Sequence, residues 1–199
     1  MKSGRIKIGI LSVILIIFVF LFGCSTPHIE GAQIEVGIQN ISIADDGIPF
    51  IIDSAGNMDV YSAALVGTYA LQYGGYESFL DEVVDENESF FHNCIDWLME
   101  SIQTNDNGHK VWLNNFDANS NDIEVEAPWY SSYTQAVGIE ALLACYEETG
   151  QSDVLQLAEE AAKIFFVPIE KGGLLFQREN DIWFEEFIVP NDNPTHSLN

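Results

Sequence analysis

Basic residues are scarce in this chain of 199 residues, in which seven Lys and Arg stand against 31 Asp and Glu. Three of the seven lie in the first 24 residues, so residues 25–199 carry a formal charge of −27, from four basic and 31 acidic side chains. Phosphate binding needs clustered Lys and Arg, which excludes nucleic acid as a partner. A densely sulfated glycan is an equally poor match. The acidic surface favours solubility, including solubility at high salt.

Spacings typical of metal sites are also missing. The four histidines are scattered, and neither Cys-x-x-Cys nor His-Glu-x-x-His occurs. The segment Asp117-Ala118-Asn119-Ser120-Asn121-Asp122 begins like a calcium loop, but it lacks the glycine at position six and the acid at position twelve. We interpret it as a plain polar loop and expect no metal.

Cysteine is rare, and only Cys24, Cys94 and Cys145 are present. Cys94 and Cys145 each stand among apolar residues in a helical pattern, which predicts two buried free thiols. A disulfide between them is the alternative, and their spacing does not decide it.

The one long apolar run, Ile8–Phe22, follows the positive residues Lys2, Arg5 and Lys7. Leu21-Phe22-Gly23-Cys24 then resembles a bacterial lipobox. We expect residues 1–24 to be a lipoprotein signal peptide, with Cys24 lipidated and the protein anchored to a membrane outside the cytoplasm. An uncleaved membrane anchor is the alternative, because the run is close to the length of a span.

Hydrophobic periodicity divides the remainder into two regions. Residues 25–57 read as a tether and a short β element, in which Pro49–Ile52 is the stronger strand. Residues 58–199 read as a helical domain, because apolar residues recur at helical spacing from Met58. A first helix ends at Gly74-Gly75, and a second runs from Phe79 to Ile102 with a pause at 85–88.

A polar loop, 104–126, precedes a third helix that we expect from about Trp129 to Glu148, with Pro128 in its first turn. Ser152 is the predicted N-cap of a fourth helix, which ends before Pro168. A hairpin over 174–187 follows.

The two helix–Gly–helix joints are alike, and they predict a mainly α fold. It is an incomplete α/α toroid of antiparallel helix pairs, with a short N-terminal β element and a β-hairpin near the C-terminus. Such a partial toroid leaves apolar helix faces in water, which favours self-association. We expect these faces around Phe90, Phe91, Phe165 and Phe166.

Acids and aromatics gather in the second strand of the hairpin. Trp183, Glu185 and Phe187 share one strand face, and Phe184 and Glu186 share the other. One acid then meets a sugar while the other is structural or solvated. The alternative is a solvated hairpin edge.

Polar groups gather at the predicted start of the third helix. Tyr130 and Thr134, and likewise Ser131 and Gln135, stand four residues apart. A helix N-terminus offers free N–H groups to an anion such as a uronate carboxylate. An ordinary amphipathic helix is the alternative.

These motifs together resemble the C-terminal domain of D-glucuronyl C5-epimerases. Pro128-Trp129, Ser131, Gln135, Leu142-Leu143, Tyr146 and Thr149-Gly150 are similar to P-W-x-S-A-M-A-Q-G…L-L-R-A-Y-x-x-T-G. Gly172-Gly173, Trp183-Phe184-Glu185-Glu186-Phe187 and His196-Ser197-Leu198-Asn199 follow in the family's order. The similarity runs from about Val60 to Asn199, where the family's L-N-G signature breaks off, and we expect the chain to be a fragment.

The resemblance implies an isomerase that removes and returns the C5 proton of a hexuronate in an extracellular polysaccharide, without a cofactor. It implies Glu186 and Glu185 as catalytic residues. It implies substrate contacts by a further set of six: Trp183, Ser131, Gln135, Trp129, His196 and Asn199.

Two positions depart from the family pattern. Phe187 replaces a catalytic tyrosine, and Ala136 replaces a glycine. We therefore expect weak activity or none from this chain alone. The alternatives are another toroidal carbohydrate enzyme, a hydrolase or lyase, or a non-catalytic remnant that binds glycan.

Overall fold

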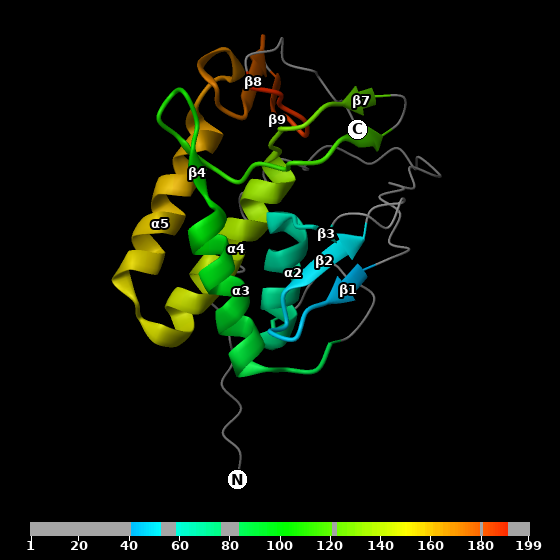
Figure 1. The fold of residues 1–199 in the computed structure, drawn as a ribbon. Coiled ribbons are helices and arrows are strands. Elements are labelled where there is room, and N and C mark those ends of the chain that lie inside the picture. Colours follow the sequence, from blue (N-terminus) through cyan, green and yellow to red (C-terminus); the bar gives the residue numbers. More distant parts are fainter. Residues whose placement is uncertain (1–40, 53–58, 77–83, 121–122, 180, 191–199) are drawn as a thin grey trace, which may run out of the picture. The chain divides into compact units, whose positions relative to one another are not determined.

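The computed structural model describes residues 41–52, 59–76, 84–120, 123–179 and 181–190 (Figure 1). The predicted leader with Cys24, and the predicted site residues His196 and Asn199, lie outside this range. Among the described residues, no helix combines the length and the apolar character needed to cross a bilayer.

A small antiparallel sheet comes first, with strand order β1-β2-β3. It comprises β1 (Ile41–Ile43), β2 (Pro49–Ile52) and β3 (Asp59–Val60). The predicted strand at Pro49–Ile52 is confirmed. The predicted helical start at Met58 is wrong, because Val60 pairs with Ile51 in the sheet.

The first two helices are α2 (Ala63–Tyr73) and α3 (Glu88–Ser101). α2 ends at Gly74, as predicted. The Asn87 amide donates to the carbonyl of Tyr73, so the start of α3 lies beside the end of α2 and the pair is antiparallel. The Asn87 side chain caps α3 by accepting from the amide of Phe90. The predicted start of this helix at Phe79 lies outside the described residues.

The second antiparallel pair is α4 (Ser132–Thr149) and α5 (Ser152–Ala162). Gly150 ends α4 in the left-handed conformation, with φ 70°. Gln151, and not Ser152, is the N-cap of α5. Two 3-10 helices follow, η2 (Lys163–Phe166) and η3 (Ile169–Lys171).

The helices pack with α2 against α3 and α4, and with α5 against α4 (Figure 1). Their core buries large side chains such as Phe91, Leu98, Trp112 and Leu142. A mainly α fold is confirmed, and it contains the two predicted antiparallel pairs.

Both cysteines of the helical core are free and buried, as predicted. Cys94 lies in α3 and Cys145 in α4, and each packs inside the same apolar cluster. Burial raises the pKa of the Cys94 thiol to about 12. It raises the pKa of Cys145 as well.

The predicted polar loop contains two short hairpins. One pairs β4 (Gln103–Thr104) with β5 (Lys110–Val111), and the other pairs β6 (Ala118–Ser120) with β7 (Ile123–Val125). Asp117, the first residue of the calcium-like segment, accepts a hydrogen bond from the amide of Ala127. Within that segment, Ala118–Ser120 form a strand and not the predicted plain loop.

The predicted third helix begins too early. Trp129 and Tyr130 are extended, with bridges from Trp129 to Asn114 and from Tyr130 to Ile188. Pro128 therefore precedes the helix and is not in its first turn. Backbone bonds to distant segments outweigh the local preference for helix here.

The C-terminal hairpin pairs β8 (Leu175–Arg178) with β9 (Asp181–Phe184), as predicted. The strand is shorter than expected, and Glu185 to Phe187 follow its end.

Of the four predicted exposed phenylalanines, only Phe166 is largely exposed, at 78%. Phe91 is buried in the core. Phe90 and Phe165 are half-buried, with their rings against Tyr73 and Phe184. The prediction is wrong for Phe91 because its helix turns that face toward α2.

Candidate functional site

A buried group of polar side chains fixes the start of α4, and we call its four members, Ser62, Asn114, Ser131 and Thr134, the Asn114 cluster. Ser131 caps the helix, since its Oγ accepts from the Thr134 amide at 3.0 Å and donates to Thr134 Oγ1 at 2.9 Å. Asn114 donates to the same oxygen at 3.3 Å and accepts from the Ser62 hydroxyl at 3.1 Å. All four side chains are buried.

Gln135 follows the cluster in α4 and is completely buried. Its Nε2 donates to the carbonyl of Trp112 at 3.4 Å, whereas its Oε1 has no partner among the described residues. An unpaired buried amide oxygen costs free energy.

The free N–H groups predicted at this helix start are used inside the protein. The Ser132 amide donates to the backbone carbonyl of Glu185 at 3.0 Å, and the Thr134 amide is capped by Ser131. The helix end is thereby tied to the segment that follows β9.

Glu185 is completely buried at this junction. Its Oε1 accepts a hydrogen bond from the indole Nε1 of Trp183 at 3.0 Å, which agrees with the predicted common face of the two residues. Its own amide donates to the carbonyl of Leu174. Trp183 in turn stacks on Phe176, with ring centroids 4.1 Å apart and planes at 29°.

Glu186 and Phe187 lie on different sides of the chain. Glu186 is half-buried. Phe187 is buried, and its ring lies 5.1 Å from that of Trp129, which also contacts Phe116. The Trp129 indole donates to the carbonyl of Phe116 at 2.7 Å. Phe187 therefore fills an apolar cluster at the place where the family pattern has a tyrosine.

The predicted site residues thus divide by exposure. Trp183 and Glu186 keep some contact with solvent. Glu185, Trp129, Ser131 and Gln135 are buried, so they support the site from inside and do not line an open surface. The arrangement leaves one residue of the acid pair, Glu186, partly accessible. The described residues include no group of three or more His, Cys, Asp or Glu that could hold a metal.

Sequence reasoning missed Asn114, the residue that joins the cluster. It stands in the polar stretch after Val111-Trp112-Leu113 and is indistinguishable there from its exposed neighbours. Its backbone pairs with Trp129 in both directions, at 2.6 and 3.0 Å. The one available signal was its position directly after an apolar triplet.

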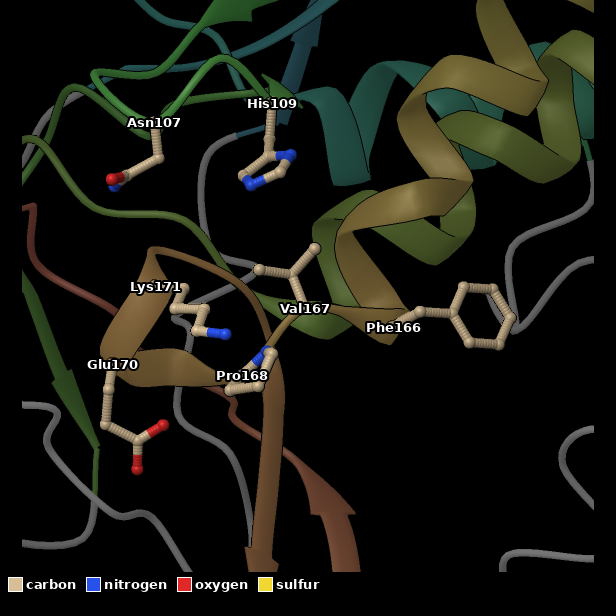
Figure 2. A pocket seen from close by; sticks show the side chains of 7 residues that line it. All are labelled: Asn107, His109, Phe166, Val167, Pro168, Glu170 and Lys171. Atoms are coloured by element: carbon tan, nitrogen blue, oxygen red, sulfur yellow. The ribbon is translucent and has the colours of Figure 1, made fainter.

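An open pocket of about 600 Å³ lies apart from these residues. Its lining comes from the β4–β5 turn and from the segment through η2 and η3 (Figure 2). The lining residues are Asn107, His109, Phe166, Val167, Pro168, Glu170 and Lys171, and none of them was predicted as a site residue.

Comparison with known proteins confirms the resemblance for the C-terminal part of the chain. Residues 105–199 match the family described as "D-glucuronyl C5-epimerase C-terminus". The match does not include the stretch from Val60 to 104 to which we had extended the similarity. An uncharacterized protein of Methanocaldococcus jannaschii is 33% identical over 93 residues, which are 45% of this chain and 29% of that protein. The alignment thus spans less than a third of this relative. No solved structure matches the chain.

Proposed function

We propose that the protein is a uronyl C5-epimerase-like isomerase that acts on a hexuronate-containing extracellular polysaccharide. The observation that carries this proposal is the match of residues 105–199 to the C5-epimerase C-terminal family. The acid pair Glu185-Glu186 falls within that match, and one of its two carboxylates keeps access to solvent.

Glu186 is the acid–base group in this proposal. The C5 proton lies α to the sugar carboxylate, and a positioned carboxylate can remove it from one face of the ring. Glu186 is half-buried, so it can reach a substrate while water around it is restricted.

Glu185 is a positioning residue. Its buried carboxylate holds the Trp183 indole, and its backbone carbonyl holds the start of α4. Trp183 is thereby held in one orientation, and its partly exposed ring can pack on the C–H face of a sugar. Ser131, Gln135 and Trp129 support this arrangement from inside, whereas contacts by His196 and Asn199 stay predictions.

Phe187 limits the expected rate. Inversion at C5 requires a proton from the face opposite to the one attacked, and a phenylalanine has no proton to give. Losing a positioned acid–base group costs about 10²–10⁴ in rate. The chain by itself should therefore be a weak epimerase.

The second candidate is a non-catalytic glycan-binding protein, and Phe187 is the observation that favours it. A hydrolase is less well supported. Its two carboxylates normally face each other across the sugar at about 5 Å or more. Here Glu185 is buried and bonded to Trp183.

Proton exchange in deuterated water tests the proposal. The full chain is incubated with a glucuronate polymer, and deuterium at C5 is measured together with chain length. Slow incorporation without cleavage is expected, and Glu186→Gln should lower it by about 10²–10⁴. Glu147→Gln, which changes an exposed acid on α4, is the matched control. Cleavage would favour a hydrolase or lyase, and binding without exchange would favour the non-catalytic candidate.

We further propose that the two antiparallel helix pairs form part of an α/α toroid, and that Cys24 carries a lipid that anchors the protein outside the cytoplasm. Self-association through exposed apolar surface such as Phe166 belongs to the same proposal. Replacing Cys24 with Ser should release the protein from the membrane fraction. Unchanged partition and unchanged mass would instead favour an uncleaved anchor.

A further inference from the structure

The pocket between the β4–β5 turn and η3, here called the Lys171 pocket, has walls that are tied together. Asn105 Oδ1 accepts from the amides of Asn107 and His109, at 3.1 and 2.9 Å, which fixes the turn. Asn105 Nδ2 donates to the carbonyl of Gly172 at 3.0 Å, which joins that turn to the residue after Lys171. The lining is therefore preorganised before any ligand arrives.

The opposite wall is equally constrained. Gly172 has φ 74°, and a side chain there would collide with the amide of Asn107. A side chain at Gly173 would collide with the backbone of Val167. Gly172 thus allows the two walls to approach closely, and Gly173 allows the chain after η3 to pack against Val167.

The lining contains one lysine, Lys171, and one acid, Glu170, in a chain with few basic residues. Four basic residues occur in residues 25–199, and three of them lie on the elements around the pocket. Lys171 lines it, Lys110 follows the lining residue His109, and Lys163 precedes Phe166 by one turn of η2. Among the described residues, no carboxylate forms an ion pair with Lys171.

The acid in the lining is directed elsewhere. Figure 2 shows Asn107 and His109 facing the segment from Val167 to Lys171, with the carboxylate of Glu170 pointing away from His109. The ring of Phe166 extends to one side as an exposed rim. A cationic group and an exposed aromatic ring in one lining suit a ligand that is both anionic and sugar-like.

We infer that the Lys171 pocket binds the carboxylate of an acidic sugar, with Lys171 as its counter-charge and Phe166 as a stacking surface at the rim. The choice of a hexuronate rests on the proposed function, whereas the anion preference rests on the pocket itself. Glu186 is not among the lining residues, so this is a second contact with the polysaccharide, separate from the reacting sugar.

Binding of a short oligoglucuronate to the full chain tests the inference. Lys171→Gln should weaken binding about fivefold, the effect of losing one charge pair at a solvated site. Lys171→Arg should restore it. Arg178→Gln is the matched control, because it removes the same charge from an exposed residue outside the lining. The carboxyl-reduced oligosaccharide should bind the unaltered chain as weakly as the oligoglucuronate binds the Lys171→Gln variant. Added salt should narrow the difference in oligoglucuronate affinity between the unaltered chain and Lys171→Gln.

Equal weakening by Lys171→Gln and Arg178→Gln would overturn the inference, because net charge alone would then explain binding. If the carboxyl-reduced oligosaccharide bound as tightly as the oligoglucuronate, or if the oligoglucuronate did not bind at all, the inference would be overturned as well. Unaltered thermal unfolding of each variant shows that the fold is kept. Deuterium exchange at C5 reports separately on the proposed function, since binding that depends on Lys171 can occur without exchange, and exchange can occur without it.

Discussion

The Asn114 cluster and the Lys171 pocket use similar polar residues in opposite ways. In the cluster, hydroxyl and amide groups bond to one another and no side chain reaches solvent. In the pocket, hydrogen bonds to Asn105 fix the backbone, while the side chains of Asn107 and Lys171 are exposed. Buried polar groups here specify structure, whereas exposed ones on a fixed backbone are left for a ligand. Mutations in the first region should change stability, and mutations in the second should change binding.

The largest difference in the free energy of unfolding is expected between the alanine variants of Glu185 and Glu186. Glu185→Ala removes the buried acceptor of the Trp183 indole and leaves a cavity, so it should lower the free energy of unfolding by about 3 kcal/mol. Glu186→Ala, at a half-buried position, should cost less than about 1 kcal/mol. Denaturant unfolding of both variants measures this, and equal losses would contradict the assignment of Glu185 as the positioning residue.

Two asparagines give a matched test of the comparison itself. Asn114→Ala removes the acceptor of the buried Ser62 hydroxyl and one of the two donors to Thr134 Oγ1, and it should cost about 2 kcal/mol. Asn107→Ala removes an exposed amide and should change stability by less than about 0.5 kcal/mol. If Asn107→Ala were as damaging as Asn114→Ala, the pocket would be structural as well.

The buried thiol of Cys94 predicts a loss of stability at alkaline pH. Its pKa is about 12 in the folded protein, against an ordinary value of 9.0. Because the folded value is higher, the unfolded chain loses its proton first as the pH rises. Stability should therefore fall between pH 9 and 12, by up to about 1.4 kcal/mol per pH unit.

Unfolding measured as a function of pH checks this prediction. Cys94→Ala should flatten the alkaline slope, whereas Asn107→Ala should leave it unchanged. An equally steep slope in Cys94→Ala would assign the effect to other groups, such as Tyr73, whose pKa burial also raises to about 12.

The smallest effect is expected at Phe166. Its ring is 78% exposed, so Phe166→Ser should change the free energy of unfolding by less than about 0.5 kcal/mol while reducing association at high concentration. Its neighbour Phe165 packs edge-on against Phe184, with centroids 5.1 Å apart, and Phe165→Ser should destabilise clearly. Sedimentation at several concentrations separates the two effects. If Phe166→Ser associated as strongly as the unaltered chain, the Phe166 ring would not take part in self-association.

Elements set by local pattern were predictable from the sequence. α2 ends at Gly74, α4 and α5 are joined through Gly150, and the C-terminal hairpin pairs as expected, because each depends on residues a few positions apart. Trp129 and Tyr130 were misjudged as helical. They are extended because Asn114 and Ile188 pair with them, and such distant partners leave no local signal.

The residues of the candidate site could be predicted from the sequence, but how deeply each of them is buried could not. Alternation along a strand placed Trp183 with Glu185 and away from Glu186, yet it could not show that Glu185 would be completely buried. The Lys171 pocket was not foreseen, because Asn105 and Gly172 are separated by 67 positions.

One peptide oxygen links the two regions compared above. The carbonyl of Gly172 accepts from Asn105 Nδ2 and from the hydroxyl of Tyr130, each at 3.0 Å, so both of its lone pairs are occupied. Tyr130 pairs through its backbone with Ile188, two residues beyond Glu186. A displacement of the turn at 172 must break one of these bonds or carry both partners along. The hinge-like freedom usual for a glycine pair is thereby lost, and the segment should behave as a rigid strut between the pocket and the strand end that bears the acids.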